Sequence, residues 1–173
     1  MHKRTLLLAL SGAAAATSLT ACGFRLRGVP QFAFSSLYVQ AGAGSGVARE
    51  LVRTLQGVGG GVTLLTEPAQ LPQAQVVLEV LSEVPERIVV GQSATGQVRE
   101  LQLRLRLRFR LRGQDGQEWI APTELVQTRD VSYSETIALS KEGEEALLFR
   151  NMQTDLVQQL MRRLATVKGP ARP

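Results

Sequence analysis

The chain has 173 residues, of which 44% are hydrophobic and 20% are charged. A single domain fits this length, and the composition excludes both a disordered chain and a multi-pass membrane protein. Seventeen arginines and three lysines outnumber the 15 acidic residues, so the formal net charge is +5 and most of the positive charge is guanidinium.

Histidine and cysteine are confined to the start of the chain. The one histidine is His2 and the one cysteine is Cys22. If this segment is processed, the remaining chain has no histidine and no free thiol, which excludes a Ser-His-Asp triad, a Cys-His pair, a zinc site and a structural disulfide. We therefore expect no catalytic residue, no bound metal and no cofactor.

Residues 1–21 read as a signal peptide. A basic start, Met1–Arg4, precedes an apolar stretch that is too short and too interrupted to span a membrane. Leu19-Thr20-Ala21-Cys22 resembles the bacterial lipobox, in which the cysteine is lipidated and the preceding peptide is removed. Several acyl chains anchor a protein stably. We predict lipid anchoring through Cys22 and a lipidated segment over 22–34; an ordinary signal peptide with an incidental cysteine is the alternative.

The next elements predicted are short. Leu37–Val39 is an apolar run before a glycine-rich loop, which favours a strand. Ser45 can cap a helix, because apolar residues follow it at helical spacing. These residues are Ala48, Leu51, Val52 and Leu55. Glycines end that helix, 62–65 predicts a brief strand, and the prolines of 68–72 indicate a connector.

Two long strands follow. The first is the apolar stretch Val76–Val90, in which Pro85 indicates an edge strand or a bulge. A glycine-bounded loop over 91–96 leads into the second strand, 101–112, where hydrophobic residues alternate with polar ones. A period of two means one buried face and one polar face. The polar face carries Gln102 and an arginine ladder, which we define as Arg104, Arg106, Arg108, Arg110 and Arg112.

The remaining elements complete the predicted fold. Residues 118–134 read as a partner strand that Pro122 breaks early, and Ser140 caps a final helix with an apolar stripe. The fold class is therefore α+β: a single layer of about four mainly antiparallel strands with two helices packed on one face. We expect one domain over 35–167 and a short flexible tail over 168–173.

The arginine ladder has two interpretations of equal weight. It is either a cationic surface for a polyanion, such as phosphorylated lipid, nucleic acid or an acidic protein wall, or a solvated sheet face. Like charges along one face repel, so we expect acidic residues on neighbouring strands, such as Glu83, Glu124 or Asp130, to oppose them. The export signal and the lack of a base-stacking aromatic pattern argue against nucleic acid.

The segment after the lipobox carries a family resemblance. Cys22-Gly23-Phe24-Arg25-Leu26-Arg27-Gly28 resembles the start of mature LptE proteins, which are lipopolysaccharide-assembly lipoproteins. The resemblance implies a non-enzymatic protein in the outer membrane, with its domain on the periplasmic side within the lumen of the LptD β-barrel. It implies that this protein plugs and helps assemble the barrel, one to one, and binds lipopolysaccharide. The family fold is a four-stranded sheet with two helices on one side.

The resemblance also suggests site residues. In the family, basic residues near the hairpin tip and at the start of the last helix contact the glycolipid. Ala138-Leu139-Ser140-Lys141 resembles the second position, so Lys141 is a candidate. At the first position the loop carries Ala94, with Arg87 and Arg99 at its flanks as substitutes. Arginine forks can replace the cations that bridge lipid A phosphates, which makes four ladder members further candidates. They are Arg104, Arg106, Arg108 and Arg110.

Two other functions compete with this interpretation. One is a solitary lipid-anchored protein that binds anionic lipid or cell-wall polymer without a barrel partner. The other is a lipoprotein hydrolase, which the missing histidines disfavour. Co-purification of a barrel distinguishes the first from the LptE interpretation, and an assay with generic substrates tests the second.

Overall fold

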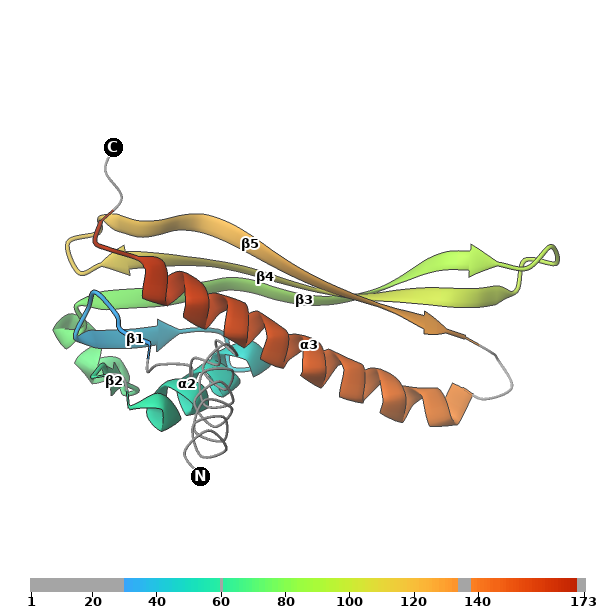
Figure 1. The fold of residues 1–173 in the computed structure, drawn as a ribbon, viewed down its shortest axis with the longest axis horizontal. Coiled ribbons are helices and arrows are strands. Elements are labelled where there is room, and N and C mark those ends of the chain that lie inside the picture. The colour runs from blue at the N-terminus through green and yellow to red at the C-terminus, as the bar shows by residue number, and fades with distance from the viewer. Residues whose placement is uncertain (1–29, 60, 134–137, 171–173) are drawn as a thin grey trace, which may run out of the picture.

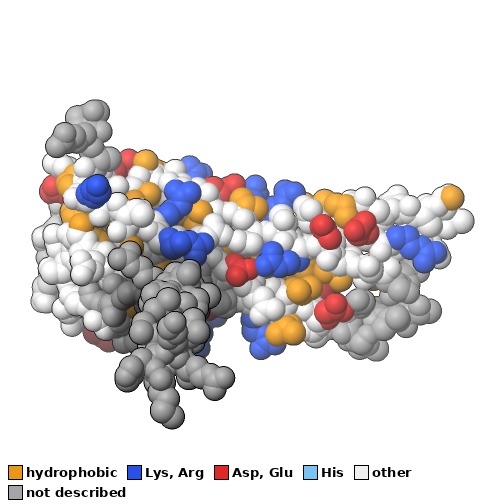
Figure 2. All heavy atoms as spheres, in the orientation of Figure 1, with side chains coloured by type: hydrophobic (Ala, Val, Ile, Leu, Met, Phe, Trp, Pro, Cys, Tyr) orange, Lys and Arg blue, Asp and Glu red, His pale blue; other side chains and the backbone are white. Residues whose placement is uncertain are grey.

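The computed structural model describes residues 30–59, 61–133 and 138–170. The molecule is elongated (Figure 1). Its long axis is formed by β3 (Val76–Gln92), β4 (Val98–Gly113) and β5 (Glu118–Ser132), with α3 (Ala138–Thr166) lying diagonally along them. One end is widened by β1 (Ser36–Gln40), α2 (Gly46–Val58), β2 (Thr63–Leu65) and the 3-10 helix η1 (Pro68–Gln73). Figure 2 views the same side, on which basic and acidic side chains are interspersed along the whole length.

The strands form one open sheet of five, in the order β2-β1-β3-β4-β5. The α+β class is as predicted, but the expected four strands are five, because the brief strand β2 pairs in parallel with β1. Gly59 ends α2 in the left-handed conformation (φ 61°), which lets the chain reverse and the Thr63 amide donate to the Ser35 carbonyl. The pairing of β1 with β3 is also parallel, and the two long pairings, β3–β4 and β4–β5, are antiparallel.

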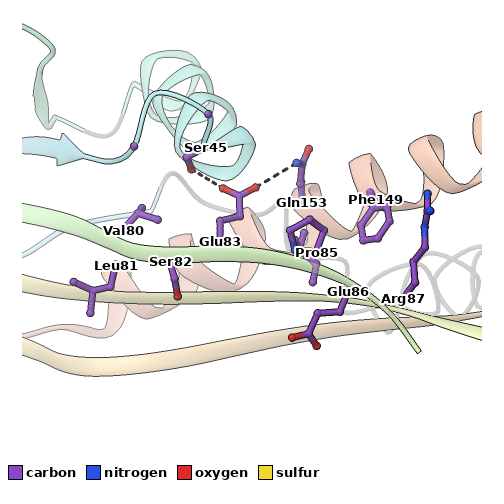
Figure 3. Close-up of a pocket in the computed structure, with 13 residues that line it drawn as sticks. Ser45, Val80, Leu81, Ser82, Glu83, Pro85, Glu86, Arg87, Phe149 and Gln153 are labelled. Atoms are coloured by element: carbon purple, nitrogen blue, oxygen red, sulfur yellow. Dashed lines mark hydrogen bonds between the residues drawn. The ribbon is translucent and has the colours of Figure 1, made fainter. Parts of the chain in front are cut away.

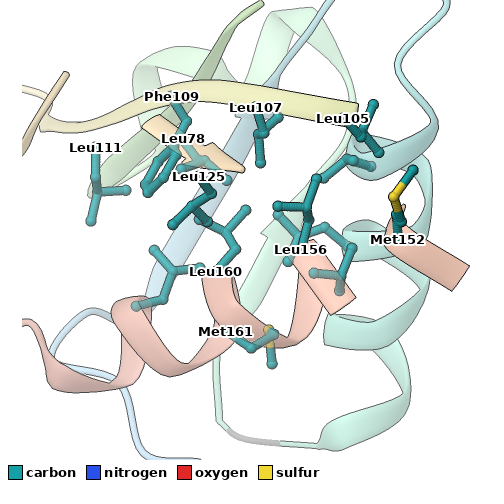
Figure 4. Packing of buried hydrophobic residues seen from close by; sticks show 14 of the residues in the cluster. Leu78, Leu105, Leu107, Phe109, Leu111, Leu125, Met152, Leu156, Leu160 and Met161 are labelled. Carbon is teal, nitrogen blue, oxygen red and sulfur yellow. The ribbon is translucent and has the colours of Figure 1, made fainter. Parts of the chain in front are cut away.

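Both helices pack on the same face of the sheet, as predicted. The alternation in β4 directs Leu103, Leu107, Phe109 and Leu111 into the core, where all four are fully buried. The stripe on α3 meets them, as Figure 4 shows for Leu156 and Leu160. Helix α2 adds Val47 and Leu51 to the same cluster. Its predicted cap is confirmed, since the Ser45 hydroxyl oxygen accepts a hydrogen bond from the Ala48 amide at 3.0 Å.

The two strand prolines behave differently from each other. Pro85 lies in the part of β3 beyond Glu79, where β1 has ended and β4 is its only strand neighbour among the described residues, so the predicted edge position is confirmed. The prediction that Pro122 breaks its strand is wrong. Strand β5 continues through a register shift between its pairs with Phe109 and Leu111, because an edge strand tolerates a missing amide hydrogen at a bulge.

The last helix starts earlier than predicted. Helix α3 begins at Ala138, so Ser140 lies in its first turn and is not its cap. Ala138 and Leu139 are strong helix formers and extend the helix toward its N-terminus. In the part of the chain that the structure describes, no helix combines the length and apolarity needed to cross a membrane.

Candidate functional site

The arginine ladder lies on the sheet face opposite the helices, which we call the outer face. On β3, the outer-face residues paired with the ladder include Glu79, opposite Arg110, and Glu86, opposite Arg104. On β5, Glu124 is opposite Arg108 and Val126 is opposite Arg106. The periodicity of β4 therefore correctly predicted that the ladder arginines lie on one face of the sheet. The residues of β3 and β5 decide which of these arginines are paired with a carboxylate.

Glu79 neutralises one end of the ladder. Its side chain is 12% exposed, it accepts a hydrogen bond from Arg110 Nε at 2.5 Å, and it accepts another from Arg112 Nε. Burial by itself would raise the pKa of the Glu79 carboxyl, but the hydrogen bonds and charges of Arg112 and Arg110 outweigh it and hold this pKa below its ordinary value. Glu79 is therefore a carboxylate at neutral pH, clamped between two guanidinium groups.

Glu86 neutralises the middle of the ladder in the same way. Its carboxylate accepts a hydrogen bond from Arg106 Nη2 at 2.7 Å and lies 3.9 Å from Arg104 Nη1. Arg104 also donates to Gln102 at 3.1 Å, and Gln102 donates to Asp130 at 3.0 Å. These contacts form a continuous polar network across three strands.

The acidic partners predicted from sequence are mostly wrong. Glu83 lies on the opposite face, Asp130 contacts Gln102 instead of an arginine, and Glu124 forms no ion pair within the described residues. For Glu83 the cause is a register shift between Val80 and Ser82. This bulge inverts the alternation of β3, so that Glu79 and Glu86 share the outer face although an odd number of positions separates them.

Arg108 differs from the other ladder members. It is exposed and has neither a hydrogen bond nor an ion pair within the described residues. Nearby, apolar side chains open onto the same face, with Val84 37% exposed and Val126 43% exposed. The outer face is thus a mixed surface of compensated arginines and small apolar patches, and it is not a bare polycation.

The helix face carries a cleft of about 920 Å³. It lies between the loop before α2, the free edge of β3 and α3, with apolar walls that include Val80, Pro85 and Phe149. Figure 3 shows Glu83 directed toward Ser45 and Gln153, while Glu86 points to the other side of the strand. The Glu83 carboxylate accepts from Ser45 Oγ at 2.6 Å and from Gln153 Nε2 at 3.4 Å, so it ties α2, β3 and α3 together.

An ion pair joins the hairpin to the start of α3. Arg87 Nε lies 2.7 Å from a carboxylate oxygen of Glu145, which is 8% exposed, while the Arg87 side chain is 62% exposed. Glu145 is one helical turn after Lys141, whose side chain lies outside the described residues. The structure thus places Arg87, a proposed substitute for a basic tip residue, next to the first turns of the helix that carries Lys141. Sequence reasoning could not rank Arg87 above Arg99, because only this contact separates them.

The other predicted site residues lie in the tip loop or outside the described residues. Ala94 is exposed in the tip loop, where the hydroxyl groups of Ser93 and Thr95 form a hydrogen bond with each other. Cys22 and the N-terminal motif lie outside the described residues; the motif comprises Gly23, Phe24, Leu26, Arg27 and Gly28. Among the described residues, no group of three or more acidic, histidine or cysteine side chains is arranged to hold a metal ion.

Solved structures of bacterial lipoproteins share this fold. The uncharacterized lipoprotein B from Nitrosomonas europaea is 26% identical, with a TM-score of 0.69 over 82% of this chain and 90% of that one. A minor lipoprotein from Acinetobacter baumannii is 23% identical, with a TM-score of 0.63 over 81% and 98%. Rare lipoprotein B from Shewanella oneidensis is 20% identical, with a TM-score of 0.62 over 76% and 94%. The last two likenesses show the fold alone.

A family model gives the assignment. No curated protein matches the chain. The model of the LptE family, described as lipopolysaccharide-assembly, matches residues 29–164. This range covers the sheet, α2, all but the last two residues of α3, the arginine ladder and the cleft, and it excludes the lipobox and the segment that follows it. The chain therefore belongs to the LptE family of lipopolysaccharide-assembly proteins.

Proposed function

We propose that this protein is a non-enzymatic outer-membrane lipoprotein that plugs and helps assemble an LptD-like β-barrel and binds lipopolysaccharide during its insertion into the outer leaflet. Family membership supports the assembly role. The lipobox supports the anchor at Cys22, and the domain would then sit on the periplasmic side within the barrel lumen. One barrel per lipoprotein follows from a plug that fills one lumen.

The cleft on the helix face is the observation that carries the glycolipid part of the proposal. Its walls combine apolar side chains with Glu83, whose carboxylate is occupied by hydrogen bonds from Ser45 and Gln153, and Arg87 stands at its rim with most of its side chain in solvent. Arg87 contacts Glu145 of α3, which lies one helical turn after Lys141. Lipopolysaccharide combines phosphates with acyl chains, so apolar walls and an exposed arginine at the rim match both parts.

The outer face is better suited to a protein wall. Glu79 and Glu86 are each shared by two arginines of the ladder, so a phosphate that displaced either carboxylate would break two ion pairs at once, which is costly. Arg87 has one ion pair and is 62% exposed, so it can contact a second anion without leaving Glu145. Of the ladder residues proposed for glycolipid contact, we therefore retain Arg108. Arg104, Arg106 and Arg110 instead form the ion pairs of the outer face. A face with compensated charges and exposed valines resembles the mixed composition of protein interfaces.

The test is co-purification of the barrel. The protein would carry a tag after Pro173, and outer membranes would be extracted in mild detergent. We expect a heat-modifiable β-barrel near one-to-one stoichiometry. The variant Arg104→Glu with Arg106→Glu should lower barrel recovery by at least about tenfold, because it places two carboxylates beside Glu86 and reverses the charge pattern of the docking face.

A matched variant controls for charge. Arg162→Glu with Arg163→Glu makes the same change in total charge at an exposed site on α3 and should leave barrel recovery unchanged. If the tagged, functional protein is recovered without a barrel, the plug assignment fails and a solitary lipid- or polymer-binding lipoprotein replaces it. If both double variants lose the barrel equally, the outer face is not the docking surface.

A further inference from the structure

A groove lined by three arginines lies between α2 and α3, beside the point where the two helices come into contact. The helices approach closely at Gly46, where a side chain would overlap the amide of Gln153. On one side of this contact the helices leave a groove of about 710 Å³. Arg49 and Arg53 line it from α2, one helical turn apart, and Arg150 lines it from α3. The close contact between the helices thus brings three guanidinium groups to one hollow.

The charges in this groove are not compensated by the protein. Arg49 donates one hydrogen bond, to the Ala43 carbonyl at 3.2 Å, and all three arginines are exposed. Within the described residues, the guanidinium groups of Arg53 and Arg150 donate no hydrogen bond and form no ion pair. The one acidic residue lining the groove, Glu50, pairs with none of them. Three like charges repel, and an anion with several acceptor oxygens would relieve the repulsion while accepting their N–H groups.

An apolar groove on the other flank of α2 decides what kind of anion fits. Arg49 and Arg53 also line this second groove, of about 530 Å³, together with Val39, Ala48 and Val52. The two arginines therefore stand between a charged hollow and an apolar one. A free phosphate would use only the first hollow, whereas a lipid has a phosphate for one and an acyl chain for the other.

We propose that Arg49, Arg53 and Arg150 form a binding site for the phosphate of an anionic lipid, with an acyl chain in the neighbouring apolar groove. The site is formed by the helices and shares no basic residue with the ladder or with the Arg87 rim. It does not rest on the proposed function, because it requires neither a barrel nor lipopolysaccharide.

Native mass spectrometry of the full lipoprotein in dodecyl maltoside tests this site. The protein would be titrated with dioctanoyl phosphatidic acid, with dioctanoyl phosphatidylcholine as the zwitterionic comparison. We expect phosphatidic acid to be retained, and Arg53→Gln with Arg150→Gln to weaken its binding by at least about fivefold through the loss of charge-assisted hydrogen bonds. Both side chains are exposed, and glutamine is as good a helix former as arginine, so the variant should keep its circular dichroism spectrum.

The control is Arg162→Gln with Arg163→Gln, which removes the same charge from exposed positions on the same helix and should change binding by less than about twofold. Equal losses in both variants would reduce the effect to net charge and overturn the site. Equal retention of phosphatidylcholine would overturn the role of the phosphate. Binding of inorganic phosphate through the same arginines, without retention of the lipid, would overturn the lipid assignment.

The apolar groove has its own test. Val52→Thr nearly keeps the volume of the side chain and replaces one methyl group of the groove wall with a hydroxyl. We expect it to weaken phosphatidic acid binding by about threefold and to leave inorganic phosphate binding unchanged. An unchanged affinity for the lipid would remove the acyl chain from the proposal.

Discussion

The two faces of the sheet are built from alternate residues of the same strand, β4, and they solve opposite problems. On the helix face, Leu107 and Phe109 are fully buried under α3. On the outer face, their neighbours Arg106 and Arg110 are half-buried and held by two glutamates of β3. The comparison shows that the period of a strand decides which face each residue lies on. The register of the neighbouring strand then decides whether the charged residues of that face meet residues of opposite charge.

The largest effect should come from the helix face. Phe109→Ala leaves a cavity in the centre of the core and should lower the free energy of unfolding by about 3–5 kcal/mol. Urea unfolding followed by circular dichroism measures this loss. Thr128→Ala, at an exposed position on β5, is the control and should cost less than about 1 kcal/mol. Similar losses in both variants would mean that the faces do not differ in packing.

A smaller effect should come from the clamp on the outer face. Glu79→Gln leaves Arg110 and Arg112 without a shared counter-charge and should lower the free energy of unfolding by about 2 kcal/mol at pH 7. Glu124→Gln removes a carboxylate of the same face that has no ion pair among the described residues. It should cost less than about 0.5 kcal/mol. A cost for Glu124→Gln that equals the cost for Glu79→Gln would contradict the clamp.

The clamp also has a pH signature. The pKa of Glu79 is lower in the folded protein than its ordinary value of 4.5, so its ionisation stabilises the fold above that value. This stabilisation is lost as the pH falls through the folded pKa. Unfolding free energies of wild type and Glu79→Gln should therefore converge as the pH falls below 4.5 and through the folded pKa. A difference that stays constant over this range would show that the variant acts through packing.

The smallest effects expected are on glycolipid binding, and they distinguish the contribution of the helix face from that of the outer face. Arg87→Glu with Lys141→Glu reverses the charge of the rim arginine and of the proposed glycolipid contact in the first turn of α3, and should weaken lipopolysaccharide binding by about tenfold. The control Arg162→Glu with Arg163→Glu makes the same charge change at exposed positions elsewhere and should have little effect. Fluorescence titration with labelled lipopolysaccharide measures both. Equal weakening would exclude the cleft as the specific site.

Arg108→Gln sharpens the same comparison from the outer face. Arg108 is the ladder member without a partner in the described residues, so its loss should weaken lipopolysaccharide binding by about threefold and leave stability unchanged. Unchanged binding at physiological salt would remove the ladder from the glycolipid site altogether.

Local patterns explain why much of the fold could be predicted. The leucine–arginine alternation over 101–112 can satisfy both its apolar and its charged residues only as a strand with two different faces. The cap at Ser45 and the glycines after α2 act within a few residues, so their roles were visible without the fold. The start of α3 and the continuation of β5 through Pro122 were missed, because helix extension and edge position depend on the surroundings.

The sequence by itself determined the fold class, the two faces of β4 and the apolar stripe of α3, because each is a periodic pattern that short-range geometry imposes. Only the tertiary structure decided what those faces do. A bulge between Val80 and Ser82 selected Glu79 and Glu86 as partners of the ladder and turned Glu83 toward the cleft. The contact at Gly46 brought arginines of two helices, far apart in the chain, to one groove. Such pairings follow from register and packing between distant segments, which no local pattern encodes.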